Sequence, residues 1–229
     1  KLMTLMKKKP TKFKRQYIIS TNPIAALDHW KNFKFDKYNI YAESSIEVNH
    51  HKIEGLEVLM LGYWVDPYRP EDTNTEITKR LCEKCNKLDS IFDFIYSLSG
   101  RFLLMLKING ECYVLNDASG FRSAFYKKDG ENAYITSNIN MLKYIEDIEI
   151  KECLEDYLVS DHYLHTRTFM WHAGFTFHKG IHHLVPNHYL NCKDWKQIRF
   201  FPNKKTEIEN DPVIIDEIIN KINRLLKSG

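Results

Sequence analysis

Residues 56–65, LEVLMLGYWV, form the stretch that most limits what this chain can fold into. The run is almost continuously apolar, whereas a strand with one wet face alternates apolar and polar side chains. It therefore predicts a strand that is covered on both faces. Gly62 interrupts the run, and Pro67 and Pro70 close it. The fold must accordingly place other elements on both sides of a sheet.

Two Asx-Gly pairs predict two β-hairpins further along the chain. Asn109-Gly110 separates RFLLMLKI from ECYVL, and Asp129-Gly130 separates SAFYKK from NAYITS. Both pairs suit the positive φ angles of two-residue turns. A shorter apolar run, QYIIS at 16–20, is the expected first strand.

Several segments have the spacing or the capping residues of helices. One of them, 75–88, places Ile77, Leu81, Cys85 and Leu88 on one helical face. The others are expected at 91–98, after the cap residue Ser137, at 151–159, and after Asp211 and Pro212. Helices that alternate with hairpins, and strands that are apolar on both faces, predict an α+β fold. The simplest arrangement is a four-layer α/β/β/α sandwich of two antiparallel sheets.

Charge and cysteine content narrow the class of protein. The 229 residues include 33 basic and 30 acidic side chains, but residues 1–15 carry seven basic side chains and no acid. A nucleic-acid interaction would depend on this arm alone, so we interpret it as a solvated terminus and expect no nucleic-acid partner. Five cysteines, an odd number, in a chain of this size indicate reduced thiols and a cytoplasmic protein. No apolar run approaches the roughly 18 residues of a membrane span, so no membrane partner is expected.

Two groups of potential metal ligands are interpreted as structural. Cys82-x-x-Cys85 lacks two further zinc ligands at comparable spacing, so packing in the core is favoured. Seven histidines crowd one region without the His-Glu-x-x-His spacing of a zinc site: His162, His165, His172, His178, His182, His183 and His188. A Cys-His nucleophile is given little weight, because its pairing cannot be seen in a sequence. We predict no bound metal.

Seven segments, taken in order, resemble one known family. They are LMLGYWVDP (59–67), TNTEI (73–77), LSGRFLLML (98–106), DASGFRSAFY (117–126), ITSNINMLKYI (135–145), FTFHKGIHHLVPNHYL (175–190) and RFFP (199–202). The series resembles the N-terminal glutaminase domain of the asparagine synthetases, which are class II glutamine amidotransferases with an Ntn-hydrolase-like fold. No single segment is specific for the family, but the occurrence of all seven in this order over about 150 residues is specific. In this family DASGFRSAFY corresponds to a hairpin corner, where we expect Gly120 to adopt the unusual dihedral and Asp117 to cap neighbouring amides.

The resemblance also implies which residues would form a glutamine site. The family's nucleophile is an N-terminal cysteine, and the expected first strand has none. The asparagine of its oxyanion hole falls at Leu61, while the following glycine is retained as Gly62. The next glutamate falls at Tyr63, and the acid that holds the substrate ammonium falls at Asn74. The resemblance therefore implies a vestigial pocket at these four positions, no catalytic residue in this chain, and no glutamine binding.

The domain division follows from the same comparison. We expect a basic arm at 1–15, a glutaminase-like domain at 16–205 and, at 206–229, a helix leading toward a synthetase (ATP pyrophosphatase) domain. That domain's Ser-Gly-Gly-x-Asp-Ser loop is not in the printed sequence. The chain itself is expected to need no cofactor, and ATP and Mg would belong to the synthetase domain. The expected partner is that domain, in cis or in trans, or a second copy of the chain in a homodimer.

Three functions remain open. The favoured one is a non-catalytic glutamine amidotransferase-like domain of an asparagine synthetase-related protein. It would have a structural or interaction role in asparagine biosynthesis, beside an ATP-dependent amide-forming domain. The second is an active glutamine-hydrolysing domain of the asparagine synthase type whose N-terminal Cys lies outside the printed sequence. The third is a ligand- or partner-binding module that uses the vestigial pocket.

Overall fold

The computed structural model describes residues 13–165, 174–202 and 211–228. The chain divides into two compact units, each formed by segments that are distant in the sequence. The described residues of the first unit are 13–46, 125–165 and 176–182, and those of the second are 47–124, 174–175, 183–202 and 211–228. The predicted basic arm lies mostly outside the described residues.

The first unit is built on a six-stranded sheet with strand order β10-β8-β9-β1-β3-β2. Its strands are β1 Tyr17–Ser20, β2 Lys31–Phe35, β3 Tyr38–Ala42, β8 Phe125–Asp129, β9 Asn132–Thr136 and β10 His182–His183. The fully buried β1 runs antiparallel to both β3 and β9, which confirms the first strand expected at 16–20. Two short 3₁₀ helices, η1 Ala25–Leu27 and η2 Ile139–Tyr144, contribute Leu27 and Leu142 to a core with Ile18 and Tyr41.

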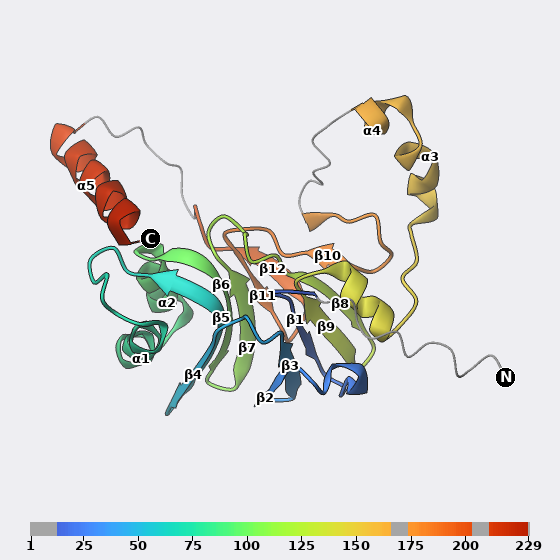
Figure 1. The fold of residues 1–229 in the computed structure, drawn as a ribbon, viewed down its shortest axis with the longest axis horizontal. Helices are drawn as coiled ribbons and strands as arrows, with labels where there is room; N and C mark the ends of the chain where they lie inside the picture. Colours follow the sequence, from blue (N-terminus) through green and yellow to red (C-terminus); the bar gives the residue numbers. More distant parts are fainter. Residues whose placement is uncertain (1–12, 166–173, 203–210, 229) are drawn as a thin grey trace. The chain divides into compact units, whose positions relative to one another are not determined.

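The second unit is built on another six-stranded sheet, with order β12-β11-β7-β6-β5-β4. Its strands are β4 Val48–Ile53, β5 Leu56–Val65, β6 Ser99–Ile108, β7 Glu111–Asn116, β11 His188–Asn191 and β12 Lys196–Arg199. Each neighbouring pair in this sheet is antiparallel. The helices α1 Asn74–Lys84 and α2 Leu88–Tyr96 lie beside this sheet (Figure 1).

Strand β5 has the position that its apolar sequence requires. Val58 and Met60 pack in one core cluster with Ile77 of α1 and Ile91 of α2. Leu59 and Leu61 alternate with them and are also fully buried, so both faces of the strand are covered. Each such side chain contributes about 1.5–3 kcal/mol by leaving water. The predicted internal strand at 56–65 is confirmed.

Both predicted hairpins form, but only one turn has the predicted residues. Asn109 and Gly110 have φ angles of 50° and 88° between the paired residues Ile108 and Glu111, as a type I′ turn requires. In the second hairpin Asp129 pairs with Asn132, so the turn residues are Gly130 and Glu131 rather than Asp129 and Gly130. Only Gly130 has a positive φ, of 56°. The glycine sets this turn, and the aspartate ends the strand.

Three of the expected helices differ from the prediction. The helix expected at 75–88 ends at Lys84, because Cys85 takes an extended conformation and Leu88 begins α2. The predicted cap Ser137 instead uses its Oγ to accept the Tyr17 N–H, and Asn138 caps the 3₁₀ helix η2. The helix expected at 151–159 is divided into the 3₁₀ helix η3 Glu152–Leu154 and the short α3 Glu155–Leu158. A further short helix, α4 Asp161–His165, follows.

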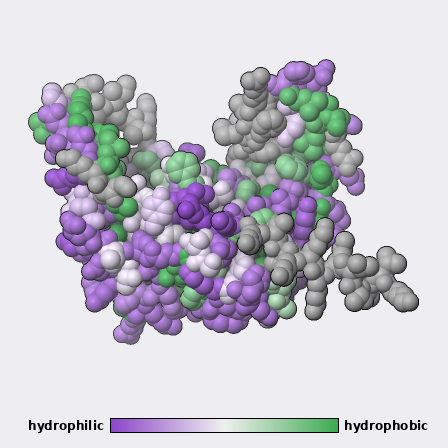
Figure 2. Space-filling view, viewed as in Figure 1, coloured by the Kyte–Doolittle hydropathy of each residue, from purple (hydrophilic) through white to green (hydrophobic). Residues whose placement is uncertain are grey.

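The C-terminal helix α5, Pro212–Ser228, begins where the sequence predicts. Asp211 Oδ1 accepts the Val213 N–H at 2.9 Å, which satisfies one of the unpaired amides of the first turn. Much of its apolar stripe is exposed, for example Ile218 and Ile222, and green side chains mark it in Figure 2. Among the described residues, no helix combines the length and apolarity needed to cross a membrane. The predicted α+β class with two antiparallel sheets is confirmed.

Candidate functional site

The four residues of the expected pocket lie near the end of β5 (Leu61, Gly62 and Tyr63) and at the start of α1 (Asn74), within the second unit. Asn74 is the first residue of α1, whose start is fixed by a capping box between Thr73 and Glu76. The connecting loop is held by Arg80 of α1, whose guanidinium contacts Asp66 at 2.6 Å and also Asp72. This frame places Asn74 beside the last residues of β5.

Asn74 is committed to a structural hydrogen bond. Its side-chain Oδ1 accepts the backbone N–H of Trp64 at 3.0 Å, and its carbonyl oxygen accepts the indole N–H of the same residue at 3.2 Å. Its other neighbour, Thr78, donates its hydroxyl to the Asn74 carbonyl oxygen at 2.7 Å. The side-chain amide therefore ties helix to strand. It is also neutral, so it offers no charge to a substrate ammonium group.

The expected oxyanion position has no donor to offer. Leu61 is 0% exposed and has a hydrocarbon side chain, in register with Val48 and Leu103. The backbone N–H of Gly62 donates to the carbonyl oxygen of Glu47 at 2.9 Å. An oxyanion hole needs donors aimed at the reacting oxygen, and both the side chain and the amide here are unable to act in that way.

Packing explains why a glycine stands at position 62. Its φ of 121° is one that side-chain-bearing residues rarely adopt, and a Cβ there would lie 2.1 Å from the carbonyl oxygen of Arg101. The same point lies 3.2 Å from Nη2 of Arg122. Position 62 thus has a structural reason to be glycine. Tyr63, which follows it, is 51% exposed.

The described residues also show where potential nucleophiles lie. Strand β1 contains no cysteine, and Ser20 at its end is fully buried. Burial raises the pKa of the Cys82 thiol to about 12 and also raises the pKa of Cys85. Both thiols are therefore protonated, and poorly nucleophilic, near neutral pH.

Three side chains of the histidine-rich region are affected by burial in the opposite sense. Burial lowers the pKa values of His178, His182 and His183 below the ordinary histidine value. His172 lies outside the described residues. Across 13–165, 174–202 and 211–228, no three His, Cys, Asp or Glu side chains are grouped as a metal site requires. The absence of zinc at Cys82 and Cys85 stays a prediction.

The corner at DASGFRSAFY has the structural role that the sequence indicates. Asp117 is 2% exposed, and its carboxylate accepts three backbone N–H groups. Oδ1 accepts those of Ser119 and Phe121 at 3.2 and 3.0 Å, and Oδ2 accepts that of Arg122 at 2.7 Å. Gly120 has the positive φ of 65° that closes the turn. The Asp117 carboxylate therefore has the structural, amide-capping role at this corner.

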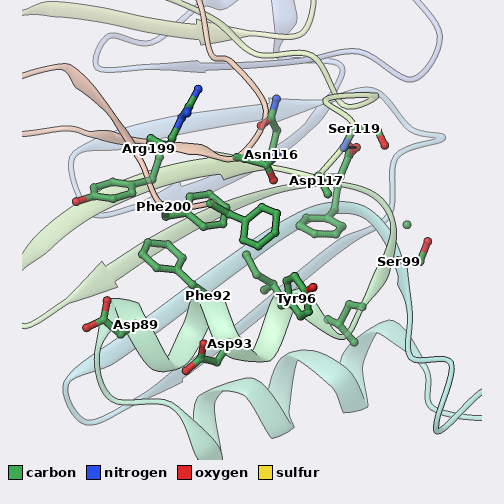
Figure 3. A pocket seen from close by; sticks show the side chains of 18 of the residues that line it. Asp89, Phe92, Asp93, Tyr96, Ser99, Asn116, Asp117, Ser119, Arg199 and Phe200 are labelled. Carbon is green, nitrogen blue, oxygen red and sulfur yellow. Dashed lines mark hydrogen bonds between the residues drawn. The ribbon is translucent and has the colours of Figure 1, made fainter. Parts of the chain in front are cut away.

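An open cavity of about 870 Å³ in the second unit was missed by the sequence analysis. It lies beside α2, the start of β6, the end of β7 and residues 198–201. Figure 3 shows aromatic rings between α2 and the strands, among them Phe92, Tyr96 and Phe200. None of Leu61, Gly62, Tyr63 and Asn74 lines this cavity.

One residue near this cavity has a buried polar atom without a hydrogen-bond partner. Asn116 is 2% exposed, and its Nδ2 donates to the Leu184 carbonyl oxygen at 3.4 Å. Its Oδ1 has no hydrogen-bond partner in the described part of the chain. Two local patterns contribute to the cavity, the aromatic and acidic residues spaced along 88–96 and the RFFP segment. Neither pattern predicts a cavity unless the tertiary contacts are known.

Comparisons with known proteins give matches among solved structures alone. No protein-family model and no curated protein matches the chain. Among solved structures, the chain is similar to a glutamine phosphoribosylpyrophosphate amidotransferase from B. subtilis complexed with ADP and GMP. The identity is 14%, the TM-score is 0.47, and the match covers 73% of this chain and 36% of that one. It is also similar to a structure described as the allosteric regulatory enzyme of purine biosynthesis, with 13% identity, a TM-score of 0.49 and coverage of 82% and 43%. The chain thus spans less than half of either structure.

Proposed function

We propose that this chain is a glutamine amidotransferase-like domain that does not hydrolyse glutamine. It acts as a structural or interaction domain of an asparagine synthetase-related protein, beside an ATP-dependent amide-forming domain in cis or in trans. ATP and Mg serve that second domain. The amide-forming domain then takes free ammonia or another amine.

The observation that carries this proposal is the absence of an available donor at Leu61 and Gly62. Losing a single donor of an oxyanion hole costs about 10²–10³ in rate. Here the side chain is a hydrocarbon, and the glycine N–H already donates to Glu47. Asn74 adds a second deficit, because its neutral amide oxygen already accepts the Trp64 N–H. The two deficits affect different steps, since one concerns transition-state charge and the other substrate binding.

The test is release of glutamate from glutamine by the purified chain. We expect no release above background. A second protein carries Cys-Gly at a shortened N-terminus together with Leu61→Asn, Tyr63→Glu and Asn74→Asp. This variant is expected to gain weak glutamine binding at most, because the supporting hydrogen bonds around the new groups are not rebuilt. Clear turnover by the unmodified chain would overturn the proposal in favour of an active amidotransferase.

A further inference from the structure

We propose that Cys112 and Cys192 are a modification site, at which a peroxide oxidant joins the two thiols in a reversible disulfide. This inference goes beyond the proposed function, because neither residue belongs to the positions expected to bind glutamine. Both residues lie in the second unit, and both are reduced thiols in the structure.

The strand register sets the two cysteines opposite each other. Strand β11 pairs with β7 in the antiparallel sense, and the pairing ends with Asn191 opposite Tyr113. The next pair in this register is Cys192 and Cys112. The backbone N–H of Cys192 donates to the Cys112 carbonyl oxygen at 3.0 Å, so the ladder continues to this pair.

The side chains of the two cysteines share one face of the sheet. The next pair outward is Glu111 and Lys193, and Lys193 Nζ contacts Glu111 Oε1 at 3.1 Å. Successive side chains of a strand point to opposite faces, so this ion pair places both cysteine side chains on the other face. Both cysteines are buried there, whereas Glu111 and Lys193 are exposed.

Strand geometry brings the pair within reach of a disulfide. The Cα atoms of opposite, hydrogen-bonded residues are about 5.5 Å apart, within the roughly 4.4–6.8 Å that disulfides span. Their Cβ atoms are about 4.5–5.5 Å apart, whereas a disulfide holds them at about 3.5–4.5 Å. The bond therefore requires a small approach of the two side chains. Cys192 is suited to make it, because it is the first residue of the turn 192–195 rather than part of β11.

A second pair of thiols in the same unit is less suited to oxidation. Cys82 and Cys85 lie at the end of α1, and both belong to the core cluster between that helix and the sheet. Cys85 Sγ already donates to the Ser90 carbonyl oxygen at 3.3 Å. A disulfide between them would remove this donor and disturb the core. We therefore expect the cross-strand pair to be oxidised in preference to this one.

The reaction balances with hydrogen peroxide as the oxidant. The sulfur of one cysteine attacks a peroxide oxygen and breaks the O–O bond, and the thiol proton leaves with the second oxygen as water. The sulfenic acid that results is attacked by the sulfur of the other cysteine. The S–S bond forms, and the sulfenic oxygen leaves as a second water with the remaining thiol proton. The two thiols lose two electrons, which reduce one peroxide to two waters, and a dithiol such as dithiothreitol restores both thiols.

The test is peptide mapping of the folded chain after treatment with hydrogen peroxide, with the remaining thiols blocked before digestion. Trypsin releases Cys112 in the peptide 108–122 and Cys192 in the peptide 180–193. We expect the disulfide that links these two peptides to be about tenfold more abundant than any other disulfide within the chain, because the fold holds the two thiols together. Dithiothreitol should remove the link. The same treatment in concentrated urea should give a mixture of pairings.

Protein variants and unfolding measurements test the effect of the bond. Cys112→Ser and Cys192→Ser should each abolish the link, and the double variant Cys82→Ser with Cys85→Ser is the matched control that should keep it. Oxidation should raise the urea midpoint of the unmodified chain by at least about 0.5 M, because the bond restricts the unfolded state. Cys192→Ser should show no such rise. The mapping of the unmodified chain does not depend on the folding of any variant.

Three results would overturn the inference. The first is a folded chain in which the two peptides stay unlinked after peroxide treatment. The second is a sulfinic acid at Cys112 or Cys192 in place of the link. The third is the same mixture of disulfides in the folded and the urea-unfolded chain. None of these measurements involves glutamine, so they do not depend on the outcome of the glutaminase assay.

Discussion

The ends of β5 and β7 belong to the same sheet, but they differ in how completely their polar groups are used. At the end of β5, Gly62 donates its N–H to Glu47 and Asn74 accepts that of Trp64. At the end of β7, Asn116 retains an amide oxygen with no partner among the described residues, beside an open cavity. The two strand ends therefore differ in whether every buried polar side-chain atom has a hydrogen-bond partner.

The same contrast appears between two consecutive residues. Asn116 and Asp117 are both 2% exposed. The carboxylate of Asp117 accepts three backbone amides and holds the corner that follows β7. The amide oxygen of Asn116 accepts none. The extent of burial therefore does not show whether a polar group has hydrogen-bond partners.

The largest predicted effect tests this pair directly. Asp117→Leu should destabilise the fold by about 4 kcal/mol, because three amides lose their acceptor and that of Arg122 is buried. Asn116→Leu has nearly the same shape change and should cost less than about 1 kcal/mol, since it loses one long hydrogen bond and also removes an unpaired oxygen. The measurement is urea unfolding monitored by tryptophan fluorescence.

Asp117→Asn provides the control for this pair, because it keeps one carbonyl oxygen as an acceptor at the corner. Its loss of stability should lie between those of the two leucine variants. Similar losses for Asp117→Leu and Asn116→Leu would contradict the distinction between a used and an unused polar group.

The second prediction concerns the closed end of β5. Gly62→Ala should cost about 3 kcal/mol, because the new Cβ would meet the Arg101 carbonyl oxygen and the φ of 121° is unfavourable for alanine. Gly110→Ala is the matched control. Its φ is also positive, at 88°, but no atom lies within 4 Å of the added Cβ. It should cost only about 1 kcal/mol, the conformational part of the effect.

Equal losses for the two glycine variants in urea unfolding would show that backbone conformation, rather than packing, requires the glycine at position 62. In that case the structural account of the retained motif would fail. A loss at position 62 that is clearly larger than the loss at position 110 would confirm that the end of β5 is closed by packing.

The sequence predicted best the features that depend on local pattern. The apolar run 56–65 forms β5, and Asn109-Gly110 forms the turn between β6 and β7. Both features could be predicted because strand burial and positive φ follow from neighbouring residues. Asp117 was correctly interpreted as a cap for the same reason. The helix at 75–88 was extended too far, since its apolar spacing continues through Cys85 to Leu88 while the backbone becomes extended at Cys85.

The cavity could not be predicted in this way. Its walls come from residues 89–102, 116–119, 187–189 and 198–201, which are brought together only by the strand order of the second sheet. Nor does the sequence reveal that the side-chain oxygen of Asn116 lacks a hydrogen-bond partner. That depends on the folded position of Leu184, whose carbonyl oxygen accepts from Nδ2. The expected pocket had the opposite problem. That these four residues form a pocket stays a prediction, and only the structure shows that the Gly62 and Asn74 groups are already hydrogen-bonded.

The smallest predicted effect lies next to Asn116. His183 precedes Leu184, and burial lowers its pKa below the ordinary value of 6.5. The unfolded chain therefore binds a proton on this residue at a higher pH than the folded chain does. Well above pH 6.5, protonation of His183 therefore has no influence on the free energy of unfolding. As the pH falls below that value, protonation in the unfolded state lowers this free energy. Between about pH 7.5 and about pH 5.5 this should lower the free energy of unfolding by less than about 1 kcal/mol, because the ring is only partly buried.

Urea unfolding at both pH values should show a smaller decrease for His183→Gln than for the unmodified chain. The decrease should not vanish, since burial also lowers the pKa values of His178 and His182. His29→Gln, at an exposed position, is the control. If His183→Gln retained the full decrease, His183 would have to be solvated near β7, and the contrast between a buried and an open side of this region would be weaker than the structure indicates.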